Sequence, residues 1–574
     1  MTCSEKPWLT NYELGPYKLD RTLIPYPEAP LYQVLDQTAA KHPGQTAILF
    51  QGRSVKYREL KNQVDRLAAS LPGLGVGKGD RVCLFLPNCT EFVLCYWAVL
   101  KAGGVVVPTS ILRTREGLLH EAGTAGCRLI VCREENLDFV LAIGERSPIE
   151  RIIVTSTAGY DVAAVSTSMP KIACELRTLL HDHEARPPRV DINPREDLCE
   201  LAFTGGATGA PKGVMLTHYN RHSVILQGLP WLMKPLMRGI AGKASVLVSI
   251  PMFHTYGNFV HQSAVYLGLR LIILPDPRDT QMQVDSIREH RPFLIPGVPT
   301  QFMRLADAGL KRVNAMLFSG SAPLPDEVGR MIKEKTGMPI SEGYGLTETC
   351  GVTHINLSAF SRITGFMAKE KPGIGVPCPD TQCRLIDPAT NQELPAGEAG
   401  ELVVRGPQIM RGYWPAPGAG LTSDGWLHTG DIAVMNEDGY FQIVDRIKDM
   451  VNVSGMKVYT TEVDQVLFSH PAVLMAAAFG VPDPTIPGSE RVMAVVRLKD
   501  DRHGMVTVQE LVDFCKAKLP PYAVPRHMEI RDDLPLTVTE KVFRKALRDE
   551  AVAQMKDRGE IKQQKGKASN HETG

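Results

Sequence analysis

Residues 201–214 read LAFTGGATGAPKGV, a short apolar run that gives way to Gly, Thr and Ala with a single lysine. Glycines let the backbone bend so that several N–H groups point into one concavity, which suits phosphate oxygens. Threonine hydroxyls add donors, and the lysine adds a positive charge. The residues that would act in this way are Thr204, Gly205, Gly206, Thr208, Gly209 and Lys212. The stretch predicts a loop that binds the phosphates of a nucleoside triphosphate.

Neither of the two common phosphate-loop motifs fits this stretch. Lys212 is followed by Gly213 rather than by Ser or Thr, so the stretch is not a Walker A loop. No GxGxxG register is present, which excludes the dinucleotide fingerprint. Taken alone, the stretch is also compatible with a surface loop that binds nothing, so the choice depends on the rest of the chain.

The sequence on either side of the loop alternates short apolar runs with amphipathic helical ones. Arg81–Pro87 and Gly104–Pro108 read as buried strands, and Glu91–Lys101 between them reads as a helix. Further strands are predicted at Arg128–Cys132, Arg151–Thr155, Ala244–Ile250 and Leu269–Leu274. Strands that alternate with helices imply βαβ units and mainly parallel sheets. We therefore expect an α/β multidomain protein.

The composition narrows the class of protein. The chain has 574 residues, and 64 Lys+Arg against 63 Asp+Glu give no basic surplus, so we expect no nucleic-acid partner. The most apolar long stretch, residues 92–112, contains Lys101 and Pro108, so we expect no transmembrane segment. The N-terminus has no apolar signal region. We expect a cytoplasmic protein whose contact with a membrane is peripheral at most. The oligomeric state stays open, with a homodimer as one option.

A change in the pattern of predicted strands and helices divides the chain into domains. Short strands with glycine turns, near Gly400–Arg405 and Gly439–Val444, predict a small β subdomain. A polar stretch follows Arg446, and a new αβ pattern then begins. The last residues are rich in Lys, Gln and Glu and nearly lack large apolar side chains, which predicts a disordered tail. We expect an N-terminal domain at 1–447, a C-terminal domain at 448–552 and a tail at 553–574.

Further motifs follow the loop in a fixed order. Together with residues 203–214 they resemble the signatures of the adenylate-forming (AMP-binding) superfamily, which includes acyl-CoA synthetases, luciferases and nonribosomal adenylation domains. The motifs are residues 251–257 (PMFHTYG), 319–324 (SGSAPL), 342–348 (EGYGLTE), 400–405 (GELVVR), 425–431 (GWLHTGD), 445–449 (DRIKD), 453–455 (VSG) and 535–548. Residues 7–12 and 46–60 are similar to the start of bacterial medium- and long-chain fatty acyl-CoA synthetases.

The resemblance implies a fold and a reaction. The fold would be a large N-terminal domain, made of two αβ sheet subdomains and a β-barrel, with a small mobile α+β C-terminal domain. The reaction would join a medium- or long-chain fatty acid to coenzyme A. ATP would be consumed through an acyl-adenylate, and Mg²⁺ would be required.

The resemblance also implies an ATP site. Residues 201–214 would hold the β- and γ-phosphates. Thr347 would contact the α-phosphate, and Glu348 would ligate Mg²⁺, which prefers oxygen ligands. Asp431 would accept hydrogen bonds from both ribose hydroxyls, and Arg446 would add a ribose contact. The residues around adenine would be Gly320, Ser321, Ala322, Glu342, Gly343 and Tyr344.

Four further roles follow from the same motif match. Lys541 would bring a positive charge to the acid carboxylate and the α-phosphate. Lys448 would be the hinge about which the C-terminal domain rotates between the two half-reactions. Ser454–Gly455 would face the coenzyme A channel. His254 and Gly345 would border the acyl pocket, with His254 as a catalytic candidate.

The match is not complete. The usual Ser-Gly-Thr-Thr of the phosphate loop is Gly-Gly-Ala-Thr at residues 205–208, which removes two hydroxyls. Glu540 replaces the usual glycine before Lys541. Asn258 stands where some long-chain members carry a gating tryptophan. Three alternatives therefore stay open: an aryl or alicyclic carboxylate–CoA ligase, a stand-alone acyl-AMP ligase that loads a carrier protein, and a non-catalytic nucleotide-binding homologue.

Overall fold

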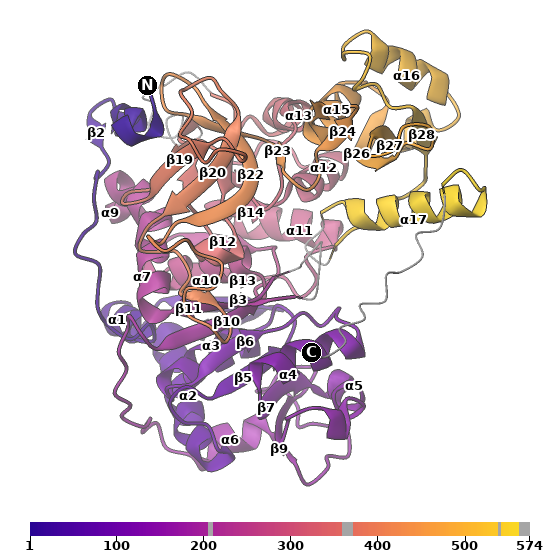
Figure 1. Cartoon of the computed structure of the whole chain (residues 1–574). Coiled ribbons are helices and arrows are strands. Elements are labelled where there is room, and N and C mark those ends of the chain that lie inside the picture. The colour runs from indigo at the N-terminus through magenta and orange to yellow at the C-terminus, as the bar shows by residue number, and fades with distance from the viewer. Residues whose placement is uncertain (205–210, 359–370, 538–540, 562–574) are drawn as a thin grey trace, which may run out of the picture. The chain divides into compact units, whose positions relative to one another are not determined.

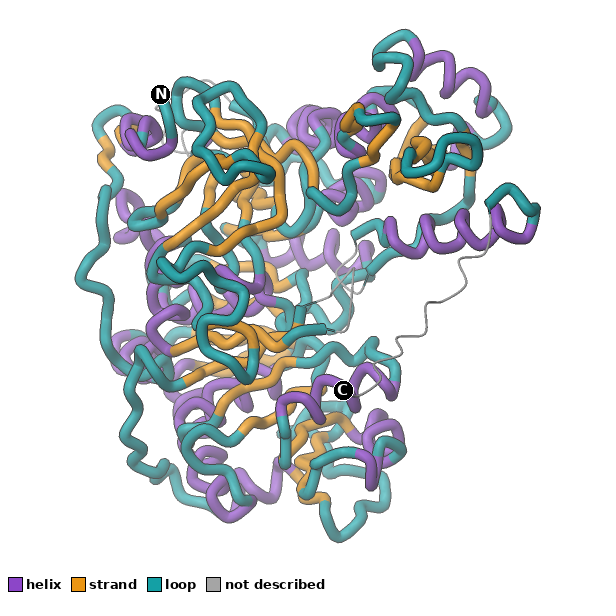
Figure 2. Tube along the Cα trace, in the orientation of Figure 1, coloured by secondary structure: helices purple, strands orange, loops and turns teal. Residues whose placement is uncertain are grey.

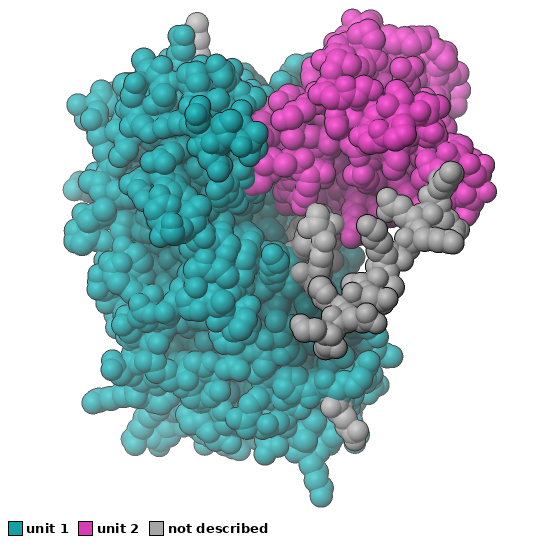
Figure 3. Space-filling view, in the orientation of Figure 1, with its two compact units in different colours: residues 1–429, 433–443 teal, residues 430–432, 444–574 magenta. Residues whose placement is uncertain are grey.

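The computed structural model describes residues 1–204, 211–358, 371–537 and 541–561. The chain forms two compact units (Figure 3). Unit 1 comprises Met1–Thr429 and Ala433–Ile443, and unit 2 comprises Gly430–Ile432 and Val444–Gly574. None of the helices in these described ranges has the length and hydropathy of a membrane span.

An eight-stranded sheet forms one part of unit 1 (Figure 1). Its order is β21 (Gly412–Tyr413), β11 (Gly213–Thr217), β10 (Leu198–Phe203), β6 (Val105–Pro108), β5 (Arg81–Phe85), β7 (Leu129–Arg133), β8 (Arg151–Thr155) and β9 (Ala173–Glu175). The strands from β10 to β9 run parallel to one another, whereas β11 and β21 add an antiparallel edge. The β-strands predicted around residues 81, 104, 128 and 151 are confirmed.

Helices cover both faces of this sheet, as the ribbon and tube views show (Figures 1 and 2). Successive residues of β5 alternate between two apolar clusters, because side chains of a strand point to opposite faces. Val82 and Leu84 pack with α2 (Tyr57–Ser70) and α3 (Thr90–Lys101), whereas Cys83 and Phe85 pack with α4 (Arg115–Ala125) and α5 (Leu137–Leu141). Burial on both faces explains why β5 and β6 read as continuous apolar runs.

A nine-stranded sheet forms the second part of unit 1. Its order is β18 (Val376–Pro377), β17 (His354–Ile355), β16 (Ile340–Tyr344), β15 (Met316–Ser319), β14 (Leu294–Gly297), β12 (Ser245–Val248), β13 (Arg270–Ile273), β3 (Thr46–Phe50) and β4 (Arg53–Lys56). Its main helices are α1 (Gln33–Lys41), α7 (His218–Gln227), α8 (Leu229–Met233), α10 (Thr255–Tyr266), α11 (Thr280–His290), α12 (Pro299–Asp307) and α13 (Asp326–Thr336). The strands from β16 to β3 are parallel, so the motifs that follow β15 and β16 lie at the same edge of the sheet.

The region of short strands forms a four-stranded sheet. Its order is β19 (Gln382–Ile386), β20 (Gly400–Arg405), β22 (Leu427–Met435) and β23 (Phe441–Arg446). The predicted strands at Gly400–Arg405 and near residue 440 are therefore present. Strands β22 and β23 contribute residues to both units.

Unit 2 has its own core around an antiparallel pair of long strands. Strand β26 (Val473–Pro482) pairs with β27 (Glu490–Leu498), which also pairs in parallel with β28 (His527–Ile530). Helices α15 (Thr460–Phe468), α16 (Val508–Lys516) and α17 (Arg544–Asp557) and the hairpin of β24 (Val451–Val453) and β25 (Met456–Val458) complete the unit. Helix α17 continues past residue 553, where the sequence predicted a disordered tail to begin, because Met555 is buried on the helix's apolar side.

Candidate active site

The residues on either side of the predicted phosphate loop belong to two paired strands. Strands β10 and β11 pair antiparallel up to Phe203 and Gly213, and the Thr204 N–H donates to the Lys212 carbonyl at 3.0 Å. Both ends of the loop are thus held by backbone hydrogen bonds. The predicted phosphate ligands Gly205, Gly206, Thr208 and Gly209 lie outside the described residues.

Tyr413 on β21 connects two of the predicted site residues. Its ring centroid lies 4.9 Å from Lys212 Nζ, and its hydroxyl donates to Glu348 Oε1 at 2.7 Å. Burial raises the pKa of Tyr413, and the Glu348 carboxylate adds to this effect, so the phenol stays protonated as a donor. No local pattern pointed to Tyr413, because only the pairing of β21 with β11 brings it to this position.

Glu348 fits the requirements of a magnesium ligand shared with phosphates. It lies in the short helical turn Thr347–Thr349, and its own carbonyl accepts from the Met410 N–H at 2.8 Å. In the described ranges, no three His, Cys, Asp or Glu side chains gather as a metal-binding group. Mg²⁺ usually takes one or two carboxylates and completes its shell with water and substrate phosphates. A single oriented carboxylate therefore suits this ion, whose charge would offset that of the phosphates.

The predicted adenine residues lie at the ends of β15 and β16. Glu342 is on β16, and its Oε1 accepts from the Leu324 N–H at 3.1 Å. Burial raises the pKa of Glu342 to about 7, and the charge of Asp326 acts in the same direction. Ser321, next to Ala322 in the loop after β15, has a left-handed backbone with φ of 70°. Tyr344 ends β16 and pairs with His354 on β17.

Three glycines of this region are required by close packing. A Cβ on Gly345 would lie 2.2 Å from the Gly351 carbonyl oxygen, and one on Gly343 would lie 2.5 Å from the Phe318 ring. A Cβ on Gly320 would lie 3.2 Å from the ring of Tyr256. At these positions the loops that carry the motifs pack closely against neighbouring segments.

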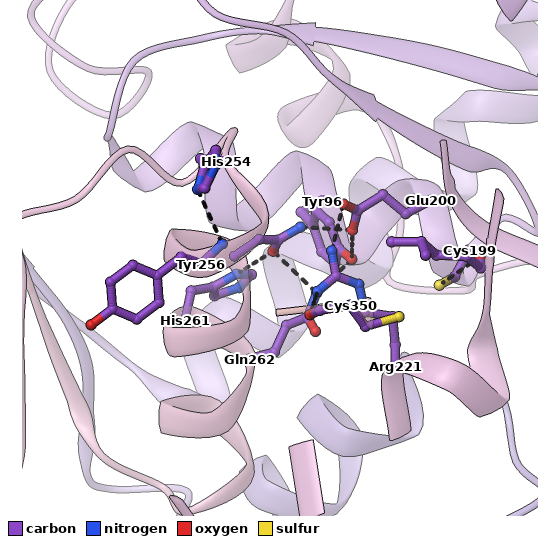
Figure 4. Close-up of polar contacts among 11 residues, drawn as sticks. Tyr96, Cys199, Glu200, Arg221, His254, Tyr256, His261, Gln262 and Cys350 are labelled. Carbon is purple, nitrogen blue, oxygen red and sulfur yellow. Dashed lines mark hydrogen bonds and ion pairs between the residues drawn. The ribbon is translucent and has the colours of Figure 1, made fainter. Parts of the chain in front are cut away.

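His254 begins helix α10. Its Nδ1 accepts from the Tyr256 N–H at 3.3 Å, so the side chain acts as the N-cap of the helix (Figure 4). The Tyr256 hydroxyl in turn donates to the Phe318 carbonyl at 2.9 Å. His254 thereby fixes the start of a helix that reaches both the adenine strands and the cavity described next. Its catalytic role and the placement of His254 and Gly345 beside the acyl chain stay predictions.

A narrow apolar cavity lies beside these strand ends in unit 1. The empty space in and in front of it, open solvent at its mouth included, is about 500 Å³. Helices α8 and α10 and strands β14, β15 and β17 contribute its walls. Tyr256 and Ser263 are the two lining residues with a polar side chain. The other lining residues are Gly228, Leu229, Leu232, Phe259, Val260, Ala264, Leu294, Pro296, Phe318, Val352 and Ile355. No short motif predicted this cavity, because its walls come from separate segments.

A buried ion pair joins two elements of unit 1 (Figure 4). Glu200 Oε1 on β10 lies 2.5 Å from Arg221 Nη2 on α7, and both side chains are 0% exposed. The second carboxylate oxygen accepts from the Tyr96 hydroxyl at 2.9 Å and from Asn258 Nδ2 at 2.7 Å. Arg221 Nη1 donates to the Cys350 carbonyl at 2.9 Å. The pair therefore joins the strand before the phosphate loop to the turn that carries Thr347 and Glu348.

Helix α10 extends this network. Gln262 Nε2 donates to the Tyr96 hydroxyl at 2.6 Å and to Asn258 Oδ1 at 3.1 Å. The His261 Nδ1 lies 3.0 Å from the same Asn258 oxygen, and burial lowers the pKa of His261 to about 3, so this ring is neutral. Asn258 thus fixes the helix whose other face lines the apolar cavity. None of these residues was predicted as part of a site.

Unit 2 holds the remaining predicted ATP residues. Asp431 is buried on β22, and its Oδ1 lies 3.2 Å from Arg446 Nε. The Thr537 N–H donates to the Lys541 carbonyl at 2.7 Å. Burial lowers the pKa of Lys541 to about 7, with Arg446 and Lys448 adding to the effect and Asp431 opposing it. Glu540 lies outside the described residues.

Ser454–Gly455 form the tip of the hairpin between β24 and β25. Both residues have positive φ, 51° and 90°, which a two-residue hairpin turn requires. The Ser454 N–H donates to Ser489 Oγ at 2.9 Å, and the Gly455 N–H donates to Asn452 Oδ1 at 2.9 Å. The turn is fixed on its scaffold. Lys448 lies in the turn between β23 and β24.

Sequence similarity to known proteins identifies the family of this chain. Residues 35–414 match the family described as AMP-binding enzyme, and residues 462–541 match the AMP-binding enzyme C-terminal domain. A long-chain-fatty-acid–CoA ligase of Bacillus subtilis is 34% identical, over 95% of this chain and 98% of that protein. A feruloyl-CoA synthase of an Amycolatopsis species is 30% identical, over 89% of this chain and 96% of that protein.

Solved structures show the same architecture. ATP-bound MatB from Rhodopseudomonas palustris has a TM-score of 0.79 and 26% identity, over 91% of this chain and 99% of that chain. The predicted adenylate-forming fold is confirmed by this likeness. The family matches span residues of both units and include the ends of β15 and β16 and the turn that carries Glu348. The chain therefore belongs to the AMP-binding enzyme family, as an acyl-CoA ligase that works through an acyl-adenylate.

Proposed function

We propose that the acid substrate is a medium- or long-chain fatty acid, and that ATP, Mg²⁺ and coenzyme A are its co-reactants. The observation that carries this proposal is the apolar cavity beside the ends of β15 and β16. Eleven of its thirteen lining residues carry no side-chain nitrogen or oxygen, so it suits a hydrocarbon chain and disfavours a charged one. The long-chain-fatty-acid–CoA ligase of Bacillus subtilis supports the same reading.

The reaction has two displacement steps. First, a carboxylate oxygen attacks the α-phosphorus of ATP, the bond to the bridging oxygen of the β-phosphate breaks, and diphosphate leaves. Second, the sulfur of coenzyme A attacks the acyl carbon, the bond to the AMP oxygen breaks, and AMP leaves. Both steps move negative charge, so they need positive groups and N–H donors placed in advance.

The proposed residue roles follow the motif match. In unit 1, Thr204, Lys212 and the loop between them hold the β- and γ-phosphates, Thr347 contacts the α-phosphate, and Glu348 ligates Mg²⁺. The adenine group is Gly320, Ser321, Ala322, Glu342, Gly343 and Tyr344. In unit 2, Asp431 and Arg446 take the ribose, Lys541 takes the reacting oxygens, Lys448 is the hinge, and Ser454–Gly455 face coenzyme A. The domain boundary at residue 447 is part of this proposal.

A second candidate is an aromatic carboxylate. Three rings, from Tyr256, Phe259 and Phe318, line the cavity and could pack against an aromatic acid. The relative named feruloyl-CoA synthase favours the same alternative. The straight-chain and aromatic acids differ in shape, so one panel of substrates separates them.

A panel of carboxylic acids, scored by AMP release with coenzyme A, tests the proposal. Straight-chain acids of graded length should give the highest kcat/KM, with a rise along the series as each methylene is buried. A maximum among cinnamic or benzoic acids would favour the aromatic candidate instead. Acid-dependent ATP–diphosphate exchange without thioester formation would indicate a ligase that loads a carrier protein. No exchange with any acid would leave only a nucleotide-binding module.

Tyr413→Phe tests the proposed metal site. The change removes the hydroxyl that donates to Glu348 but keeps the ring beside Lys212. Loss of a group that orients a metal ligand typically weakens metal affinity about 10- to 100-fold, so ATP–diphosphate exchange should require that much more Mg²⁺. Tyr160→Phe is the matched control, because that hydroxyl donates to Gln63, away from the site. An unchanged Mg²⁺ requirement in Tyr413→Phe would contradict the role.

A further inference from the structure

One face of helix α10 forms a wall of the apolar cavity. The lining residues Tyr256, Phe259, Val260, Ser263 and Ala264 are spaced three, one, three and one residues apart, which is the spacing of one helix face. Four of them present rings or alkyl groups. The fifth, Ser263, carries a hydroxyl.

The Ser263 hydroxyl has no hydrogen-bond partner among the described residues. The residue is 1% exposed, so it is shielded from bulk solvent. A helical serine usually turns its hydroxyl to the carbonyl four residues before it, as Ser223 does in α7, where Oγ donates to the Tyr219 carbonyl at 2.8 Å. Ser263 makes no such bond to Phe259.

An unpaired buried hydroxyl is costly, and alanine would complete the wall without that cost. The neighbour Ala264 already does so. The hydroxyl therefore calls for a partner that the surrounding side chains do not supply. The cavity that Ser263 lines is the place from which a ligand could supply it.

The position of Ser263 sets where that partner lies. Tyr256 marks the end of the cavity next to the adenine strands, because its hydroxyl donates to the Phe318 carbonyl. Ser263 is seven residues further along α10, which is about 10 Å along the helix axis. A group that reaches Ser263 thus belongs to the chain of the acid and not to its carboxylate.

We infer that the acid carries an oxygen substituent, a hydroxyl or a keto group, on its chain about 10 Å from the Tyr256 end of the cavity, and that Ser263 recognises it. This inference rests on the proposed function, since it takes the cavity as the acyl site. A serine hydroxyl can donate and accept, so it pairs with either substituent. At other depths the substituent would meet apolar side chains and stay unpaired. The preference should therefore depend on the position of the oxygen along the chain.

Acids of one length that differ only in the position of a hydroxyl group test this inference. The unsubstituted acid and its positional hydroxy isomers are compared by kcat/KM for AMP release with coenzyme A. In the wild type, kcat/KM for one isomer, or for two adjacent isomers, should exceed that for the others by about tenfold. This is the effect of one well-placed hydrogen bond in a site without water. Ser263→Ala should remove this preference, so that the positional isomers no longer differ in kcat/KM.

Ser223→Ala is the matched control, because it also removes a buried hydroxyl from a helix of unit 1 but not from the cavity. It should keep the positional preference. The inference is overturned if unsubstituted acids are activated and the hydroxy isomers show no difference in kcat/KM. It is also overturned if Ser263→Ala lowers kcat/KM for all acids by the same factor. In both cases the proposed function stands. Absence of activity with every acid would instead remove the proposed function and this inference together.

Discussion

Lys541→Ala is expected to lower acyl-adenylate formation by at least about a hundredfold, the usual effect of deleting one group that stabilises charge in a transition state. The carboxylate and the α-phosphate both carry negative charge when they meet, and a compact ammonium can lie between two oxygens. Thioester formation from supplied acyl-AMP should persist, because that step no longer joins two anions. ATP–diphosphate exchange and thioester release from acyl-AMP measure the two steps separately.

Lys545→Ala is the matched control for this experiment. Lys545 is an exposed lysine in the first turn of α17, four residues after Lys541. Its loss should leave both steps unchanged. If Lys541→Ala lowered the rates of acyl-adenylate formation and of thioester formation equally, the residue would serve the fold or the whole site. The proposed role would then be wrong.

The pH profile adds an independent readout. Burial and the charges of Arg446 and Lys448 lower the pKa of Lys541 to about 7. The ammonium is present below this pH and is lost above it, so kcat/KM for adenylation should fall as the pH rises through about 7. Lys541→Ala should lose this limb of the profile. If the variant keeps the fall in kcat/KM with rising pH, that fall is due to the titration of another group.

The strands and the motifs of the candidate site could be recognised in the sequence because their signals are local. The continuous apolar runs that became β5 and β6 reflect burial on both faces of a parallel sheet. The motifs at β15 and β16 could be recognised from their residues alone. His254 shows the limit of this approach: the sequence predicts a pocket residue, and the structure adds that its imidazole caps α10.

The rest depends on contacts between distant segments. Tyr413 meets Lys212 and Glu348 only because β21 pairs with β11. The cavity is assembled from helices and strands that a single motif cannot specify. Glu200 interrupts an apolar strand, which signals a buried partner, but the sequence alone does not say that the partner is Arg221 on the following helix.

Arg221→Met is expected to destabilise unit 1 by about 3–5 kcal/mol, the usual cost of breaking a buried ion pair by removing one partner. The variant would leave the Glu200 carboxylate at 0% exposure with the donors of Tyr96 and Asn258 alone. Urea unfolding followed by tryptophan fluorescence measures the effect in unit 1. All five tryptophans belong to that unit, at residues 8, 97, 231, 414 and 426.

Arg195→Met is the matched surface control. Arg195 pairs with Glu28 at 2.8 Å, but both side chains are more than half exposed. An exposed pair is screened by solvent and contributes little, so the unfolding midpoint should move far less than in Arg221→Met.

The double variant Arg221→Met/Glu200→Gln separates charge burial from packing. Removing both charges leaves a neutral amide that can still accept from Tyr96 and Asn258, so much of the lost stability should return. The stability lost in the double variant is compared with the sum of the losses in Arg221→Met alone and Glu200→Gln alone. If the two losses simply add, the buried charge is not the cause, and the loss comes from packing around α7. If the two effects cancel in part but the double variant needs more ATP than the wild type, the Arg221 contact to the Cys350 carbonyl sets the turn that carries Glu348. That outcome would make the ion pair a positioning element for the phosphate site as well as a stabilising one.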